Sequence, residues 1–570
     1  MKKIFTRLSI ISYLSMVPVL LAQTYTLEPI SVTDTTLSYF EDTQEELHSQ
    51  VQIQETAPGL YNPVINGLQG DKISITVDGL RFSNAIWRSG PNQYFSWIPQ
   101  EFVLNNDVLP TSDAIGSTLN TDLGINGNIL SYKFDQYNTG NKVLGTIDCD
   151  SVKAGVKYYT TDNYNDVNHT SYNQNAFYLE QDSTIGTSRI LFSESKDIDR
   201  PDKFLKNKPY TWDKQQYLLL QHTYAFNKEN SIVGSFQRFF EEVNDNGTIY
   251  STRDHMYGLK YQSLITNEIN VYISNYYEDI QHKDDNYLYN TVSAGVEYTQ
   301  NYNLFSFYAR YNVSDAYVKW DNEKKNFFNN AITLEIFDDS WYGRYDYGYK
   351  FPTLENLAYA QTTGKGYDLP NNNLKQETSH TFTLGIKDNK GEKLTYDASI
   401  FYLYMNNLID REKLSYQIND EDVYQSVNID TGYMFGANLS TNFSIAQFDN
   451  IFTLQYVYGK TEQDYISKLT PLKLFYKTVY DDFYFKWEYA PKSHTLSQSD
   501  QADVRIVDDR YNQYNNKGYN IFSVGLKKEI TKKQVISVDL NNIFDNDGRV
   551  IGSSVDVPER SFSISYIVKL

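Results

Sequence analysis

Segments in which apolar and polar side chains alternate recur from about residue 150 to the end of the chain. In the last segment, SFSISYIVKL, every second residue from Phe562 to Leu570 is apolar, and Ser561, Ser563 and Ser565 fall on the opposite face. A side-chain period of two is the pattern of a β-strand. Short clusters of Asn, Asp, Gly and Lys separate the segments, as turns between strands require. The sequence therefore predicts an all-β fold for this region.

The length of these segments indicates a membrane protein. A tilted strand of about 9–11 residues crosses a bilayer, and strands exposed to lipid must close into a barrel so that every backbone group finds a partner. The 51 tyrosines and 31 phenylalanines fit the aromatic girdles of such barrels. After residue 22 no apolar run reaches the roughly 18 residues of a transmembrane helix. We expect a transmembrane β-barrel, although the alternation by itself also fits a secreted soluble β protein.

Residues 1–22, MKKIFTRLSIISYLSMVPVLLA, have the layout of a bacterial secretory signal. Lys2, Lys3 and Arg7 form a positive start, an apolar stretch follows, and Ala22 is small enough for cleavage after it. An uncleaved anchor helix is the alternative, but the apolar stretch is short and contains Pro18. The sequence therefore predicts export, and with the barrel it predicts the outer membrane of a Gram-negative bacterium.

The composition argues against several classes of function. Lys and Arg number 51 against 71 Asp and Glu, a net charge of −20, which is unfavourable for binding nucleic acid. The single cysteine, Cys149, excludes an intrachain disulfide framework, and the seven histidines lack metal-ligand spacing. Nucleophile-elbow, zinc-protease and phosphate-loop motifs are missing from the sequence. We therefore predict that the protein is not an enzyme and has no catalytic residues, structural metal or cofactor.

An apolar island lies close to the start of the mature chain, within residues 23–50. Its residues are Leu27, Glu28, Pro29, Ile30, Ser31, Val32 and Thr33. It resembles the Ton box of TonB-dependent outer-membrane receptors, which adds as a strand to the periplasmic domain of TonB. The resemblance implies that residues 23–50 form this box and a periplasmic extension, and a chance short strand remains the alternative.

Residues 51–150 carry a second group of motifs. Asp78-Gly79 is a strong turn signal after the alternating stretch KISITV. The motif residues are Gly67, Asp78, Gly79, Arg81, Arg88, Gly90, Pro91, Asn92, Gln93, Tyr94, Asp113 and Gly116. They resemble the plug domain of the same receptors, although Asn66 stands where arginine is usual. For Arg81 and Arg88 we favour ion pairs between plug and barrel over contacts with a ligand.

Residues 151–570 carry the third group. Its motif residues are Phe351, Pro352, Leu354, Asn373, Leu374, Glu377 and Arg560. They resemble the paired barrel motifs and the last strands of the receptors. The resemblance thus runs nearly end to end and implies an all-β membrane protein, a 22-stranded antiparallel transmembrane barrel with an N-terminal α+β plug domain inside.

The resemblance also implies a function. Such receptors are monomers in outer-membrane lipid that transport a scarce small-molecule ligand with energy delivered by TonB from the inner-membrane proton gradient. The segment Arg88–Tyr94 is most similar to receptors for haem or host iron proteins. However, 358–370 lacks the histidine common in haem receptors. An iron complex, either haem or a ferric siderophore, is the expected ligand, with cobalamin as an alternative. A passive porin-like channel or structural barrel with a degenerate plug is the competing function.

Overall fold

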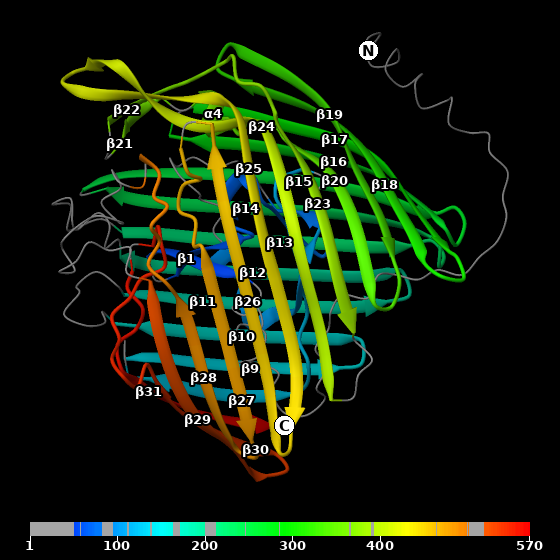
Figure 1. The fold of residues 1–570 in the computed structure, drawn as a ribbon, viewed down its shortest axis with the longest axis vertical. Coiled ribbons are helices and arrows are strands. Elements are labelled where there is room, and N and C mark those ends of the chain that lie inside the picture. Colours follow the sequence, from blue (N-terminus) through cyan, green and yellow to red (C-terminus); the bar gives the residue numbers. More distant parts are fainter. Residues whose placement is uncertain are drawn as a thin grey trace.

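The computed structural model describes residues 51–570, except 58, 83–94, 111–112, 137–138, 163–170, 200–211, 246, 284, 359, 364–365, 389–392, 463, 499, 501–517 and 554. These residues form a closed β-barrel around a small N-terminal domain (Figure 1). Without the short β21–β22 hairpin, the wall has 22 strands, each antiparallel to its neighbours, as predicted. Among the described residues, no helix combines the length and the apolar character needed to cross a bilayer.

The wall strands follow one another in chain order until the last strand closes on the first. They are β8 (Ile129–Asp135), β9 (Gly140–Cys149), β10 (Val152–Thr161), β11 (Tyr172–Ser183), β12 (Gly186–Asp199), β13 (Trp212–Ala225), β14 (Asn230–Asp245), β15 (Thr248–Leu264), β16 (Ile269–His282), β17 (Asp285–Asn301), β18 (Ser306–Trp320), β19 (Glu323–Phe337), β20 (Trp341–Lys350), β23 (Glu377–Asp388), β24 (Leu394–Ile418), β25 (Glu421–Ile445), β26 (Phe448–Thr461), β27 (Leu472–Tyr480), β28 (Phe483–Ala490), β29 (Tyr519–Thr531), β30 (Gln534–Asn541) and β31 (Ser561–Lys569). Closure of β31 onto β8 removes the free sheet edges that hydrocarbon could not satisfy.

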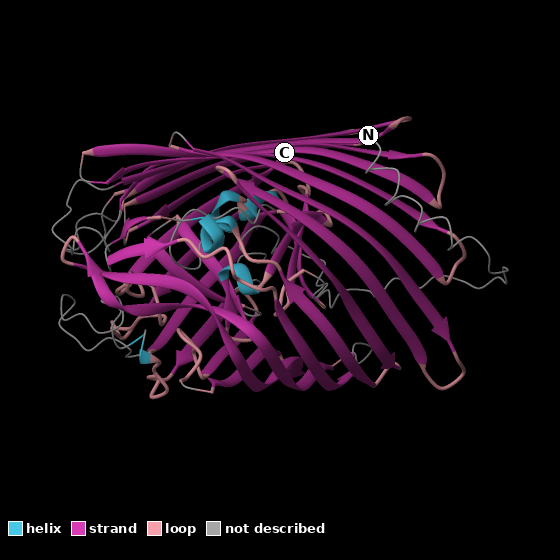
Figure 2. Cartoon of the chain, turned by 90° about the horizontal axis from the view of Figure 1, so that it is seen from above, coloured by secondary structure: helices cyan, strands magenta, loops and turns pink. Residues whose placement is uncertain are grey.

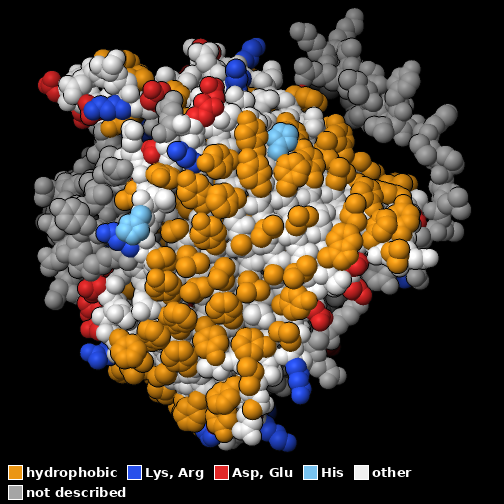
Figure 3. All heavy atoms as spheres, viewed as in Figure 1, with side chains coloured by type: hydrophobic (Ala, Val, Ile, Leu, Met, Phe, Trp, Pro, Cys, Tyr) orange, Lys and Arg blue, Asp and Glu red, His pale blue; other side chains and the backbone are white. Residues whose placement is uncertain are grey.

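The predicted alternation sorts side chains between the two faces of the wall. In β31, Ser561, Ser563 and Ser565 are buried inside, whereas Phe562 and Ile564 remain 42% and 37% exposed. The exposed apolar side chains gather into a broad band over the wall strands (Figure 3). A polar interior and an apolar exterior are what a barrel in lipid requires.

The connections differ between the two ends of the barrel. At one end they are tight, as at 150–151, 184–185, 481–482 and 532–533. The opposite end carries the long segments 351–376, 491–518 and 542–560. Outer-membrane barrels place short turns in the periplasm and longer loops outside, so the end with the long segments is the extracellular one. There β24 and β25 extend beyond the wall, and β22 (Gly366–Leu369), joined to β21 (Gln361–Thr363), pairs in parallel with β25 (Figure 1).

The barrel begins earlier than predicted. The sequence assigned 51–150 to the plug, but β8 and β9 within that range are the first two wall strands, so the wall starts at Ile129 rather than at residue 151. The sequence of β8, ILSYKFD, is short, and its Lys133 and Asp135 weaken the apolar alternation that marked the later strands. A strand of this kind is distinguished from a plug strand only by the partners it finds.

The plug consists of two small sheets and short turns. Its strands are β1 (Gln52–Ala57), β2 (Leu60–Ile65) and β3 (Leu68–Gln69) in one sheet, and β4 (Ser74–Val77), β5 (Leu80–Arg81), β6 (Val103–Leu109) and β7 (Thr118–Leu123) in the other. In the described plug residues the helical elements are 3-10 turns, η2 (Gly70–Lys72), η3 (Phe95–Trp97) and η4 (Gln100–Phe102). Seen from above, helical turns lie between opposite walls of the barrel (Figure 2).

Apolar packing joins the plug to the wall. Phe82 of the plug lies 5.6 Å from Tyr217 and 4.9 Å from Phe239 of the wall, measured between ring centroids. Phe102 stacks on Tyr178 of β11, and a Cβ at Gly155 in β10 would lie 2.5 Å from the Phe102 ring. The wall therefore needs glycine at this position to admit the plug. One buried cluster runs through both domains, so the plug shares its core with the barrel.

Candidate functional site

The predicted turn at Asp78-Gly79 joins β4 to β5. Both residues have positive φ, 50° and 70°, which is the geometry of a two-residue hairpin turn. One Asp78 carboxylate oxygen accepts the Leu123 N–H at 2.9 Å, and the other lies 3.5 Å from the Arg189 guanidinium of β12. Burial raises the pKa of Asp78 to about 6, although Arg189 opposes this shift. The turn thus contacts the wall near the periplasmic end of β12.

Arg81, two residues further on, lies between plug and wall. Its guanidinium donates to Thr291 Oγ1 of β17 at 2.8 Å and lies 4.0 Å from the Asp113 carboxylate. Its backbone carbonyl accepts from Gln237 of β14 at 2.8 Å. Arg81 is buried, with 7% of its surface exposed. Arg81 thus joins plug and wall through hydrogen bonds, while its contact with Asp113 lies within the plug.

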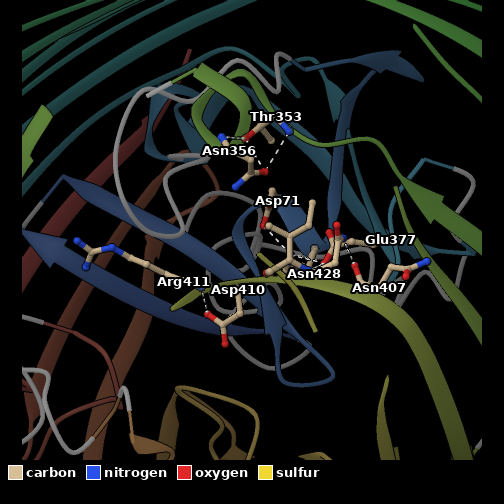
Figure 4. A network of polar contacts seen from close by, with 10 residues as sticks. Asp71, Thr353, Asn356, Glu377, Asn407, Asp410, Arg411 and Asn428 are labelled. Atoms are coloured by element: carbon tan, nitrogen blue, oxygen red, sulfur yellow. Dashed lines mark hydrogen bonds and ion pairs between the residues drawn. The ribbon is translucent and has the colours of Figure 1, made fainter. Parts of the chain in front are cut away.

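The second barrel motif supplies the partner of a plug lysine. Lys72 Nζ lies 2.5 Å from Glu377 Oε1 and donates to the Ile409 carbonyl at 3.1 Å, while the Ile409 N–H donates to the same Oε1 at 2.7 Å. We call Lys72, Glu377 and Ile409 the Lys72 anchor. Figure 4 shows Glu377 near Asp71, whose carboxylate lies 3.7 Å from Lys72 Nζ. Burial alone would lower the pKa of Lys72, but Asp71 and Glu377 raise it, so the lysine remains charged.

The carboxylate in this anchor is only half satisfied. Glu377 is 0% exposed, and its Oε2 has no hydrogen-bond partner within the described part of the chain. Gly116 holds the backbone of Lys72, because the Gly116 N–H donates to the Lys72 carbonyl at 2.8 Å. A Cβ at Gly116 would lie 2.9 Å from Leu68, so the close packing here favours glycine. Two sequence motifs, one in each domain, therefore meet at a single buried ion pair.

A further ion pair between plug and barrel involves residues outside the sequence motifs, and the sequence analysis did not predict it. Glu101 of η4 pairs with Lys157 at 2.7 Å and with Lys142 at 3.2 Å, through separate oxygens. Lys157 also donates to Gln174 at 2.7 Å. We call Glu101, Lys142 and Lys157 the Glu101 anchor. Burial would raise the pKa of Glu101, but the two lysines lower it to about 2. No local pattern could reveal it, since both lysines lie on wall strands distant in sequence.

The remaining motif residues shape the structure around these anchors. Phe351, Leu354 and Leu374 are buried in one cluster where the segment 351–376 folds back against the wall, with α4 (Leu354–Ala358) at its start. Thr353 donates its N–H to Asn356 Oδ1 at 3.0 Å beside Pro352 (Figure 4). Asn373 and Arg560 are exposed and use their backbone N–H groups, which donate to Asn371 at 2.9 Å and Asp545 at 2.8 Å.

Both backbone conformation and packing require glycine at position 67. Its φ is +79°, and a Cβ there would lie 3.0 Å from Met434 and 3.1 Å from Leu469. Asn66, which replaces the usual arginine, accepts a hydrogen bond from Asn438 of β25 at 3.1 Å. A neutral contact thus stands at this place between plug and wall.

Part of the predicted site lies outside the described residues. This applies to Leu27, Glu28, Pro29, Ile30, Ser31, Val32 and Thr33, and to Arg88, Gly90, Pro91, Asn92, Gln93 and Tyr94. Their proposed roles stay predictions. Within the ranges that the structure describes, no group of three or more His, Cys, Asp or Glu side chains is placed to hold a metal ion.

Solved structures share this architecture. The copper transporter OprC superposes with a TM-score of 0.74 at 12% identity, covering 93% of this chain and 98% of its own. The FrpB iron transporter from Neisseria meningitidis (F3-3 variant) gives 0.73 at 12% identity, covering 94% and 97%. The Serratia marcescens hemophore receptor HasR, in complex with its hemophore HasA and heme, gives 0.72 at 10% identity, covering 92% and 95%. At these identities the likeness concerns the fold.

Sequence comparison identifies the family. No curated protein matches the sequence significantly. The family described as TonB dependent receptor-like, beta-barrel matches residues 65–543, which is most of the chain and includes the plug motifs and every wall strand except β31. The chain therefore belongs to the TonB-dependent receptor family.

Proposed function

We propose that the protein is an active transporter that carries a scarce iron complex, haem or a ferric siderophore, across the outer membrane with energy delivered by TonB. The observation that carries the proposal is the seated plug. It shares a buried core with the wall and is held by the Lys72 and Glu101 anchors. A barrel closed in this way needs an external source of work to open, and membership in the receptor family supplies TonB as that source.

The anchors fit a plug that is displaced and restored. Ion pairs and hydrogen bonds can break and re-form without covalent chemistry. Each anchor joins residues of the plug to residues of the wall. In the proposal, ligand binding at the extracellular end shifts the plug towards a state that TonB can engage. A pull on residues 27–33 then separates the anchors and opens a path.

The ligand class rests on the structural neighbours. They include a copper transporter, an iron transporter, a hemophore receptor with heme and the siderophore receptor PirA from Acinetobacter baumannii. Three of these four concern iron or its complexes, which supports haem or a ferric siderophore as the substrate proposed here. Cobalamin is the alternative substrate.

Binding of a purified TonB periplasmic domain to the mature protein tests the energy source. Ile30→Pro removes a backbone donor and should abolish strand addition, whereas Ile30→Val keeps the donor and serves as the matched control. Binding by the native and Ile30→Val proteins but not by Ile30→Pro supports the proposal. Equal binding by all three, or by none, contradicts residues 27–33 as the contact.

A passive channel is the second candidate, and Asn66 is the observation that favours it. Asn66 and Asn438 form a neutral hydrogen bond where an arginine would bring a positive charge. The plug therefore has one charge fewer to hold it to the wall at this point. Conductance across a planar bilayer separates the two functions. Steady ion current through the native protein without TonB supports the passive channel, and a closed barrel supports the gated transporter.

A further inference from the structure

A row of one leucine and three aromatic side chains marks the extracellular edge of the apolar belt on β13–β16. Leu220, Phe236, Tyr257 and Tyr277 are directly opposite one another on consecutive strands. The ring centroids of Phe236 and Tyr257 lie 5.2 Å apart, and Tyr257 is 51% exposed. Such a row is typical of the boundary between hydrocarbon and headgroups.

Cationic residues follow immediately on the extracellular side of this row. In the next row of paired residues Arg238 is opposite His255, and in the row after that Phe240 is opposite Arg253. These side chains point outwards, because the intervening Phe239 packs on Phe82 of the plug and Met256 is fully buried. The strands thus change from apolar to cationic within two residues.

Phe240 organises the two arginines. Their guanidinium carbons lie 5.6 Å and 5.7 Å from the centre of its ring, one from Arg238 and one from Arg253. Although Phe240 belongs to the outward face, only 9% of its surface is exposed. Cation–π contacts of this kind hold guanidinium groups in defined positions, so the pair is arranged before any ligand arrives.

The two arginines form no ion pair with a neighbour. Within the described part of the chain, neither Arg238 nor Arg253 has a carboxylate within ion-pair distance. On the outward face, the nearest acidic residues in the register are Asp279, opposite His255, and Glu242, one row beyond Phe240. In a protein with a net charge of −20, two arginines without an ion pair thus share one aromatic ring.

We propose that Arg238, Arg253 and Phe240 form a binding site for the phosphate of a lipid headgroup in the outer leaflet. The site lies at the level where headgroups meet the wall, and the fork of an arginine matches phosphate oxygens. The aromatic row beneath contacts the start of the acyl chains. The ligand class is a phosphorylated glycolipid, distinct from the transported substrate, which would occupy the interior.

Lipid binding to the full mature protein in detergent tests the site by native mass spectrometry. The probes are lipid A with two phosphates, the same lipid without phosphates, and inorganic phosphate. Arg238→Gln/Arg253→Gln should weaken binding of lipid A roughly tenfold or more, as loss of charge-assisted hydrogen bonds implies. It should leave binding of the dephosphorylated lipid unchanged.

Two further variants distinguish a specific binding site from a non-specific effect of positive charge. Lys532→Gln/Lys533→Gln removes the same charge at an exposed periplasmic turn and should bind lipid A as the native protein does. Phe240→Leu keeps all charges and should show an intermediate loss. Heat-modifiable gel mobility verifies that every variant remains a folded barrel.

Other outcomes overturn the proposal. If the periplasmic pair weakens binding as much as the arginine pair, the attraction is non-specific. If phosphate-free lipid binds the native protein as well as lipid A, the arginines do not recognise phosphate. If inorganic phosphate at equal concentration displaces the lipid, the site takes free phosphate rather than a headgroup.

Discussion

The Lys72 and Glu101 anchors hold the plug with opposite polarity. In the Lys72 anchor a plug cation meets a wall carboxylate, and one oxygen of that carboxylate has no partner among the described residues. In the Glu101 anchor a plug carboxylate meets two wall lysines, each on its own oxygen. The carboxylate of the Lys72 anchor has one lysine as its counter-charge, whereas the carboxylate of the Glu101 anchor has two. The two anchors should therefore respond differently to the loss of one group.

The largest effect is expected from Lys72→Met. Glu377 would remain buried without a counter-charge, and removal of one partner from a buried pair costs roughly 3–5 kcal/mol. We expect this loss in the free energy of plug opening, measured by native-state hydrogen exchange at the amides of β4. The double variant Lys72→Met/Glu377→Gln should recover much of the stability. A loss below about 1 kcal/mol in the single variant would show that the carboxylate is not held by Lys72.

A smaller effect is expected from Glu101→Gln. The amide keeps the size of the side chain, Lys157 keeps Gln174, and the Lys142 side chain is 20% exposed and can reach water. The cost should be about 1.5–3 kcal/mol, as for a hydrogen bond to a charged group. Hydrogen exchange of the plug measures it. Glu412→Gln, at an exposed position on β24, is the control and should change nothing. A loss equal to that of Lys72→Met would remove the distinction between the anchors.

Acid should weaken the Glu101 anchor. The lysines lower the pKa of Glu101 to about 2 from an ordinary value of 4.5, so the native protein binds this proton less tightly than the unfolded chain. Its contribution is complete above 4.5 and is lost as the pH falls towards 2. The difference in plug stability between the native protein and Glu101→Gln should therefore shrink on acidification from pH 5 to pH 3. A difference that stays constant would contradict the lowered pKa.

The smallest effect is expected at the turn, away from both anchors. A Cβ at Gly79 would meet only Lys260 Nζ at 3.7 Å, so Gly79→Ala is penalised by its positive φ of 70° alone. This strain costs about 1–2 kcal/mol. Urea unfolding of the plug measures it. Gly145→Ala in β9, where the nearest atoms lie 3.6 Å and 3.9 Å away, should not destabilise the protein. Equal effects at both glycines would show that backbone conformation is not the cause.

The sequence predicted part of the plug–wall contact site, because the motif residues occupy positions with a special backbone conformation or buried positions. Asp78-Gly79 was predicted as a turn and is one, and Glu377 belonged to a motif whose partner was not identified. Lys72 was part of the plug motif but lies 305 residues from Glu377 in the chain. Spacing in the sequence carries no information about such a pair. Glu101, Lys142 and Lys157 had no motif at all.

The sequence by itself determined the strands and their two faces. Alternation over about ten residues is a local property of the pleated backbone, and it sorts Phe562 and Ile564 to the outside and Ser563 and Ser565 to the inside. The tertiary structure alone decided where the wall begins, how β31 meets β8, and which charges pair across the lumen. The physical reason is that barrel closure brings together residues from distant strands, and their contact depends on strand register and on the seating of the plug.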